Sequence, residues 1–400
     1  MRRISVHERR ARLAARHHLA PSALAETPHE AARDLVAVHA TDAATVFLSI
    51  AARLRQPDIG AIEHALYEQR TLVRMLGMRR TVFVVPRELV SAVQAACADA
   101  IAAAERRRTI QLFEGAGLVE DAATWLQDLE QSTVAALEAR GEATAAELSK
   151  AEPRLGLRIR MAEGKNYAGW LAVSTRLLFL LAAQGRIVRA RPRGSWISSQ
   201  HRWAPMSSWL NGQLEPRSSA EAQAELVRCW LARFGPGTAA DLRWWTGLTA
   251  REINQALARL DTLPVDLDGT PGMLLADDLE PASPIEPWVA LLPALDATPM
   301  GWTAREWFLG PHGPMLFDRS GNIGPTVWAD GRIVGGWAQR GDGEIAFRLL
   351  EDIGSEATAA IAAAAERLRS WLGATRVTPR FRTPLERALG TPADSTRPQS

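Results

Sequence analysis

Apolar residues recur at helical spacing along much of the chain, and short alternating runs interrupt them. The clearest example lies at 219–279. Ala220–Phe234 has the periodicity of an amphipathic helix, and two shorter helices are predicted at 239–246 and 250–260, each after a threonine that can cap it. Two apolar runs around a Gly-rich turn predict a hairpin at 263–275. Helix, turn, helix and hairpin in this order predict a winged-helix unit.

A second copy of this pattern runs from Gly141 to Trp203. Its apolar spacing and breaks predict helices at 145–150 and 170–184. Strands are predicted at 186–190 and 195–201, on either side of an Arg-Pro-Arg-Gly turn. These strands and their turn form the predicted wing of the second unit.

The start of the chain carries a weaker third copy. Its predicted helices and strand pair lie at 8–17, 28–38, 59–68, 72–78 and 81–85. Further helices, at 86–111 and 121–139, connect it to the second copy.

After Pro281 the pattern changes to short apolar runs separated by Gly, Pro and Asp. These runs predict the strands of a small sheet or barrel, at 288–292, 315–317, 325–328, 332–337 and 345–349. An Ala-rich helix is predicted at 354–372, and the Pro/Ser/Thr-rich tail behind it is expected to be partly disordered.

The sequence therefore predicts a mainly α fold with β wings, in which three tandem winged-helix units precede a small C-terminal antiparallel β-barrel or sheet. The predicted domains are winged helix 1 at 1–90, linking helices at 91–140, winged helix 2 with a basic wing at 141–216, winged helix 3 at 217–284, the C-terminal β-barrel and helix at 285–376, and a tail at 377–400.

Charge is balanced overall but segregated along the chain. Lys and Arg number 47 against 45 Asp and Glu, a net charge of +2. Residues 164–214 hold seven basic residues and no carboxylate, whereas 261–296 hold carboxylates and no base. Phosphates repel carboxylates and favour guanidinium groups, so the basic stretch predicts a surface for DNA and the acidic segment a surface that faces away from it. The alternative is a solvated Arg-rich hairpin.

Candidate contacts with double-stranded DNA are the basic and aromatic residues of this stretch and an arginine pair in the first predicted hairpin. They are Arg79, Arg80, Lys165, Arg176, Arg186, Arg189, Arg191, Arg193, Trp196, His201 and Arg202.

Several classes of protein are disfavoured by the sequence. Cys97 and Cys229 match no metal or disulfide spacing, and no phosphate-cradling motif is present, so neither metal nor cofactor is expected. No apolar run is long enough to span a membrane, and the N-terminus lacks a signal core. We expect a cytoplasmic, nucleoid-associated protein. Three unlike units in one chain favour a monomer over the two-fold dimers of most regulators.

A polar cluster interrupts the apolar pattern of the first unit. His39, Thr41 and Asp42 lie within four residues, so they either hydrogen-bond internally or face a cleft. In one interpretation Asp42 or Thr41 caps a helix that begins near Ala43. In the other, His39 and a neighbouring hydroxyl or carboxylate hold a reactive water. Spacing alone does not choose between them.

The chain resembles the winged-helix DNA glycosylases of the AlkZ/YcaQ type in two lines of sequence and in the order of its predicted units. The lines are 65–86, ALYEQRTLVRMLGMRRTVFVVP, and 317–337, FDRSGNIGPTVWADGRIVGGW. The resemblance covers roughly residues 5–372. It implies three winged helices and a β-barrel that clamp duplex DNA, and removal of alkylated bases, including bulky and crosslinked purine adducts.

The resemblance places the family's catalytic motif, Gln-hydrophobic-Gln or Gln-hydrophobic-Asp, on His39-Ala40-Thr41. Neither glutamine is kept. His39 can accept a water proton, and Thr41 can hold a water by hydrogen bonds. Asp42 is the nearest carboxylate, one position past the motif.

We expect a monofunctional glycosylase that hydrolyses the N-glycosidic bond. The alternatives are a non-catalytic DNA-binding protein, either a transcriptional regulator or a damage sensor, and a scaffold for protein interactions.

Overall fold

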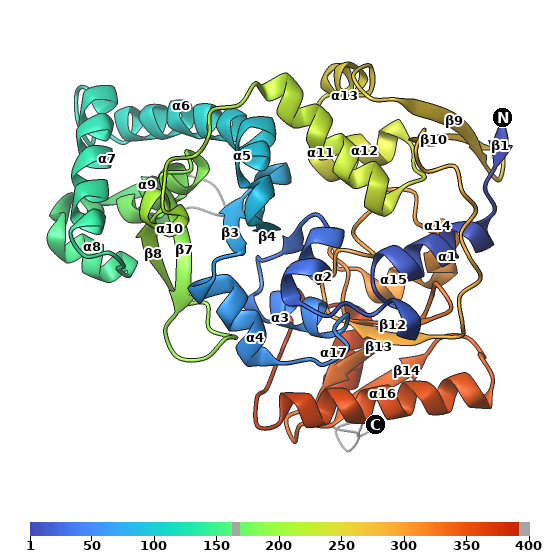
Figure 1. Cartoon of the computed structure of the whole chain (residues 1–400). Coiled ribbons are helices and arrows are strands. Elements are labelled where there is room, and N and C mark those ends of the chain that lie inside the picture. The colour runs from blue at the N-terminus through green and yellow to red at the C-terminus, as the bar shows by residue number, and fades with distance from the viewer. Residues whose placement is uncertain (162–168, 392–400) are drawn as a thin grey trace, which may run out of the picture. The chain divides into compact units, whose positions relative to one another are not determined.

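The computed structural model describes residues 1–161 and 169–391, which form a mixed helix and strand fold (Figure 1). Contacts divide the chain into two compact units: unit 1 comprises Met1–Ala65 and Val227–Ser400, and unit 2 comprises Leu66–Leu226. Within the described ranges, no helix combines the length and the apolar character that a membrane span requires. Lys165 and the end of the predicted tail lie outside the described residues.

The N-terminal part of unit 1 consists mainly of helices. Its elements are β1 (Arg2–Arg3), α1 (Val6–Arg16), α2 (Pro28–Asp34), β2 (Val38–His39), α3 (Ala43–Ala51) and α4 (Ile59–Glu63). The helix predicted at 28–38 stops at Asp34, because Val36 has a left-handed backbone with φ of 61° and ends the helical turn.

The elements predicted at 219–279 are present. They are α11 (Ser219–Phe234), α12 (Ala239–Thr246), α13 (Ala250–Leu257), β9 (Thr262–Leu267) and β10 (Thr270–Leu275). Thr238 and Thr249 each form a capping box at the start of a helix, and Gly247 ends α12 with φ of 76°. Strands β9 and β10 are antiparallel, and β1 adds to β9 in parallel.

The C-terminal part of unit 1 contains a four-stranded antiparallel sheet in the order β11-β12-β13-β14. Figure 1 labels β12, β13 and β14 of this sheet. Its elements are β11 (Val289–Leu292), α14 (Glu306–Leu309), α15 (Gly313–Leu316), β12 (Thr326–Ala329), β13 (Arg332–Gln339), β14 (Ile345–Leu349), α16 (Ser355–Leu372) and α17 (Pro384–Gly390). Helix α16 packs against β11 and β14, and α17 packs against β13.

Two predictions for this part need correction, and the tail contains an element that was not predicted. The sheet is open, so the predicted alternative of a closed barrel is wrong for the described strands. The run at 315–317 is not a strand, because Gly313-Pro314 starts a short helix there. The tail contains α17, whose Leu385 and Leu389 are buried one helical turn apart. The helix was not predicted because the tail is rich in Pro, Ser and Thr, and these two leucines were overlooked.

An aromatic cluster forms much of the core of unit 1. Trp302 lies 5.3 Å from Phe234, 5.2 Å from Trp307 and 6.2 Å from Trp230, measured between ring centroids. The Trp230 indole donates a hydrogen bond to the Gly301 carbonyl at 3.2 Å. The cluster therefore packs α11 against the segment that follows β11.

Unit 2 combines helices with three hairpins. Its elements are β3 (Leu72–Leu76), β4 (Val82–Pro86), α5 (Val90–Val93), α6 (Asp99–Gly115), α7 (Ala122–Glu138), α8 (Ala145–Ala151), β5 (Arg158–Met161), β6 (Gly169–Ala172), α9 (Val173–Ala183), β7 (Ile187–Pro192), β8 (His201–Pro205) and α10 (Met206–Leu210). Strands β3 and β4, β5 and β6, and β7 and β8 pair antiparallel. Buried side chains from α7, α8, α9 and β7 form one core.

Two predictions in unit 2 are shifted. The helix predicted at 170–184 begins at Val173, and Trp170 lies instead in the unpredicted hairpin of β5 and β6. The second strand of the predicted wing is β8, at His201–Pro205, rather than 195–201. Residues 193–200 form a loop, because Gly194 has φ of 85° and bends the chain directly after β7.

Candidate catalytic segment and nucleic-acid interface

His39, Thr41 and Asp42 lie on one short connection in unit 1. His39 ends β2, and Asp42 directly precedes α3. The His39 side chain is buried, whereas Thr41 and Asp42 are partly exposed. The strand end, the turn and the helix start therefore hold three polar groups at the edge of an apolar core.

Asp42 is the N-cap of α3, which confirms the capping interpretation. Its Oδ1 accepts a hydrogen bond from the Ala44 amide at 3.1 Å. Its Oδ2 accepts one from the Arg380 amide at 3.0 Å. Both carboxylate oxygens thus have structural partners, and this geometry favours a positioning role for Asp42 over that of a base.

Side chains on the buried face of helix α3 form hydrogen bonds with the segment after β11. The Thr45 hydroxyl donates to the Ala294 carbonyl at 2.9 Å, and the Ser49 hydroxyl donates to Asp296 Oδ2 at 2.7 Å. The Arg53 guanidinium, just beyond the helix, forms a fully buried ion pair with Asp296 at 2.8 Å. These contacts limit the movement of the His39–Asp42 segment.

A cavity of about 20 Å³ lies beside the start of α3, where Asp42 and Thr45 line it together with Gln339 and Thr378. This is room for about one water molecule with polar partners. The arrangement places a water-sized space next to the segment that carries His39 and Thr41.

Although residues 164–214 include no carboxylate, the folded chain brings carboxylates from other segments next to the arginines of this stretch. Acidic residues from other parts of unit 2 lie within ion-pair distance of its arginines. The pairs are Arg176–Glu105 at 3.5 Å, Arg186–Glu130 at 3.5 Å, Arg191–Glu68 at 3.1 Å, Arg193–Glu147 at 2.5 Å and Arg202–Glu142 at 3.6 Å. Glu105 and Glu130 are almost fully buried. Arg176 and Arg186, which pair with them, therefore compensate negative charge inside unit 2.

Aromatic rings orient several of these arginines. Arg189 lies over Trp203 at 5.5 Å from the ring centroid, and Arg191 lies over Tyr67 at 5.0 Å. Trp196 is buried in the loop after β7, which favours a packing role for its indole. Several arginines of the basic wing therefore contact aromatic rings and carboxylates as well as solvent.

Arg79 and Arg80 lie in the turn between β3 and β4. Both have left-handed backbones, with φ of 52° and 59°. Arg80 donates to Glu105 at 2.8 Å and lies over Phe179 at 4.7 Å, whereas burial lowers the pKa of Arg79. Arg80 is the more exposed of the two and the better placed for a phosphate.

The hairpin of β5 and β6 was not predicted from the sequence, and it carries exposed basic and aromatic side chains. Trp170 is 65% exposed, and it pairs across the hairpin with the exposed Arg160. Arg158 is also exposed on β5. The alternation of Arg, Ile, Arg and Met at 158–161 was the available signal for a half-buried strand.

Short helices followed by hairpins, with arginines beside aromatic rings, are typical of a class of proteins that bind nucleic acids. A comparison with protein families narrows this class. The family described as DNA glycosylase AlkZ-like matches residues 32–371. The chain therefore belongs to the AlkZ-like DNA glycosylase family.

Solved structures agree with this assignment. The DNA glycosylase AlkZ of Streptomyces sahachiroi is similar in fold, with a TM-score of 0.71 at 18% sequence identity. The similarity covers 94% of this chain and 98% of the AlkZ chain. No curated protein matches the sequence significantly.

Proposed function

We propose that this protein is a monofunctional DNA glycosylase that removes alkylated or bulky-adduct bases from duplex DNA. The observation that carries the proposal is the position of His39-Ala40-Thr41, in a chain of this family, on a segment anchored by α3. We further propose that the elements at 1–90, 141–216 and 217–284 act as three winged-helix units on the duplex, and that the protein works as a monomer.

The proposed reaction is hydrolysis of the N-glycosidic bond. His39 accepts a proton from the attacking water, and the Thr41 hydroxyl holds that water by hydrogen bonds. An alkylated purine already carries positive charge and leaves readily, so it needs little acid catalysis. Asp42 keeps the segment in place through α3 and Arg380.

Attachment to DNA is assigned to unit 2. The basic wing supplies Arg189, Arg191, Arg193 and Arg202 to phosphates, where DNA competes with the carboxylates that now hold several of them. The exposed Trp170 adds a flat apolar group that can press on a sugar or base step.

A base-release assay tests the proposal. Duplex DNA carrying methylated or bulky purines is incubated with the protein, treated with alkali and examined for strand scission. His39→Ala should lower base release at least about 100-fold, the typical contribution of a general base, without loss of DNA affinity. His39→Gln, which restores the family residue, should retain activity. His7→Ala, an exposed histidine on α1, is the matched control.

A non-catalytic DNA-binding protein is the second candidate, because neither glutamine of the family motif is present. In that case wild-type protein leaves all alkylated duplexes intact, and His39→Ala changes nothing. Normal DNA affinity together with this result would falsify the glycosylase proposal and favour a regulator or damage sensor.

A further inference from the structure

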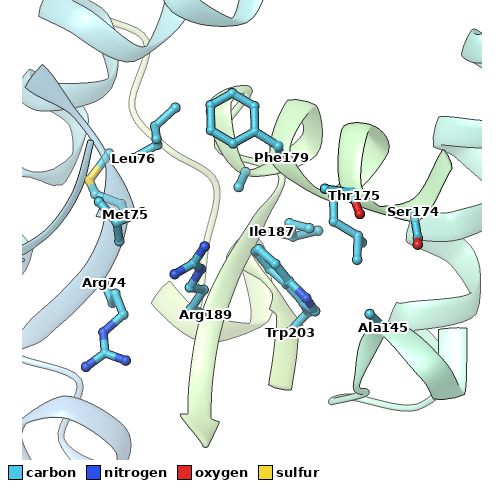
Figure 2. Close-up of a pocket in the computed structure, with 13 residues that line it drawn as sticks. Arg74, Met75, Leu76, Ala145, Ser174, Thr175, Phe179, Ile187, Arg189 and Trp203 are labelled. Atoms are coloured by element: carbon cyan, nitrogen blue, oxygen red, sulfur yellow. The ribbon is translucent and has the colours of Figure 1, made fainter. Parts of the chain in front are cut away.

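A cavity of about 290 Å³ lies within unit 2, between strand β3, helix α9 and the hairpin of β7 and β8 (Figure 2). Figure 2 shows Arg74 and Arg189 on one side and Ser174 and Thr175 on the other, with Ile187 and Trp203 between them. Most of the lining is apolar. Its size is close to the lower limit of about 300 Å³ for ligand pockets, which suits a ligand of one or two rings.

The cavity contains a buried cation that has no carboxylate partner among the described residues. The Arg74 side chain is 3% exposed, and its only polar contact among the described residues is between Nη1 and the His201 ring, at 3.2 Å from Nδ1. Its Nε and Nη2 atoms are buried and have no hydrogen-bond partner there. Arg53 in unit 1 is also buried, but unlike Arg74 it forms an ion pair with a carboxylate, that of Asp296.

His201 cannot neutralise this charge. Burial, followed by the positive charges of Arg74 and Arg189, lowers the pKa of His201 to about 3. The imidazole is therefore neutral at physiological pH and can only offer a lone pair to Arg74. Leaving a guanidinium buried without an anion costs several kcal/mol, so the site favours a ligand that brings one.

We propose that this cavity binds a small ligand with a flat apolar body of one or two rings and a single anionic group. The anion meets Nε and Nη2 of Arg74, which present the fork geometry that suits a carboxylate or phosphate. The rings pack between Phe179, Ile187 and Trp203. A phosphate of duplex DNA does not fit this description, because a side chain that is 3% exposed lies too deep for a duplex backbone. The inference is independent of the glycosylase proposal.

Binding of 2-naphthoate to the full-length protein, measured by calorimetry, tests the inference. Its neutral analogue 2-naphthamide is the matched control for charge. One site for 2-naphthoate is expected, with at least tenfold weaker binding of the amide. Arg74→Met should weaken 2-naphthoate binding at least tenfold, whereas Arg158→Met, at an exposed arginine, should not change it.

Two further measurements keep the test decisive. Arg74→Met should unfold at the same or a higher temperature than the wild type, because it removes an uncompensated buried charge. Ala182→Phe adds a ring to the lining of the cavity while both arginines are kept, and it should also abolish binding. Equal affinity for the acid and the amide, or unchanged binding to Arg74→Met, overturns the proposal. A competition experiment gives another outcome that overturns the proposal: duplex DNA displaces 2-naphthoate from the wild type but not from Arg158→Met.

Discussion

Asp34 illustrates how a buried carboxylate is kept charged in unit 1. It contacts His18 at 2.9 Å, Arg33 at 2.8 Å and Arg233 at 2.9 Å. Burial alone raises the pKa of Asp34, but the hydrogen bonds from His18 and Arg33 and the nearby positive charges outweigh it and lower the pKa to about 2. The ionised form therefore connects α2 to α11.

This lowered pKa predicts an acid-sensitive contribution to stability. Because the folded pKa of about 2 lies below the ordinary aspartate pKa of 3.8, the contribution is present above pH 4 and is lost as pH falls toward 2. The gap in unfolding free energy between wild type and Asp34→Asn should be largest above pH 4 and narrow below it. Urea unfolding at several pH values measures the gap, and a constant gap contradicts the assignment.

Asp42 offers a second test at the scale of one residue. Asparagine caps helices about as well as aspartate, but its NH2 group cannot accept the hydrogen bond from the Arg380 amide. Asp42→Asn should therefore cost about 1 kcal/mol, whereas Asp42→Ala, which loses the cap as well, should cost about 2 kcal/mol. Both variants should release alkylated bases far better than His39→Ala. Thermal unfolding and base release measure the two effects. Complete inactivity of a stable Asp42→Asn variant would instead make Asp42 a catalytic group.

At the scale of elements, the position of the candidate catalytic segment depends on the contacts that hold α3 against the segment after β11. Arg53 and Asp296 are fully buried against each other, so removal of one leaves the other charged and unpaired. Arg53→Met should therefore lower the unfolding free energy by about 3 to 5 kcal/mol. The double variant Arg53→Met with Asp296→Leu should recover part of this loss in denaturant unfolding. Costs that simply add would show that the two residues do not interact.

Element boundaries could be predicted well where the signal is local. Thr238 and Thr249 both start helices as predicted, because a cap depends on a side chain and an amide three residues apart. The second strand of the basic wing was misplaced, because Ser195–His201 and the true strand His201–Pro205 have similar local propensity. Only pairing with β7 distinguishes them.

At the scale of the whole molecule, charges that are segregated in sequence are compensated in space. The acidic segment supplies Asp278 to Arg12 at 2.8 Å and Asp296 to Arg53, both within unit 1. The basic stretch receives carboxylates within unit 2, such as Glu147 at 2.5 Å from Arg193. Charge patterning along the chain therefore overestimates the net positive surface available to DNA.

The exposed pair of Arg193 and Glu147 gives a prediction for DNA binding. Glu147→Gln keeps a side chain able to cap α8 but frees Arg193 for a phosphate. Affinity for duplex DNA at low salt should rise about two- to fivefold, and the slope of log affinity against log salt should steepen by up to about 1. Glu366→Gln, which removes a similar exposed pair with Arg369 on α16, is the control. Equal effects of the two variants would place the DNA contact elsewhere.

The sequence by itself determined most helices, many of their caps, and the hairpin of β9 and β10. These features depend on periodicity and on contacts within a few residues, so they are encoded locally. Tertiary structure decided which charges form ion pairs, that Asp42 accepts from the Arg380 amide, and that Arg74 is buried beside His201 with no carboxylate partner among the described residues. Arg53 and Asp296 are separated by 243 positions, and no local pattern reports a pairing that only packing creates.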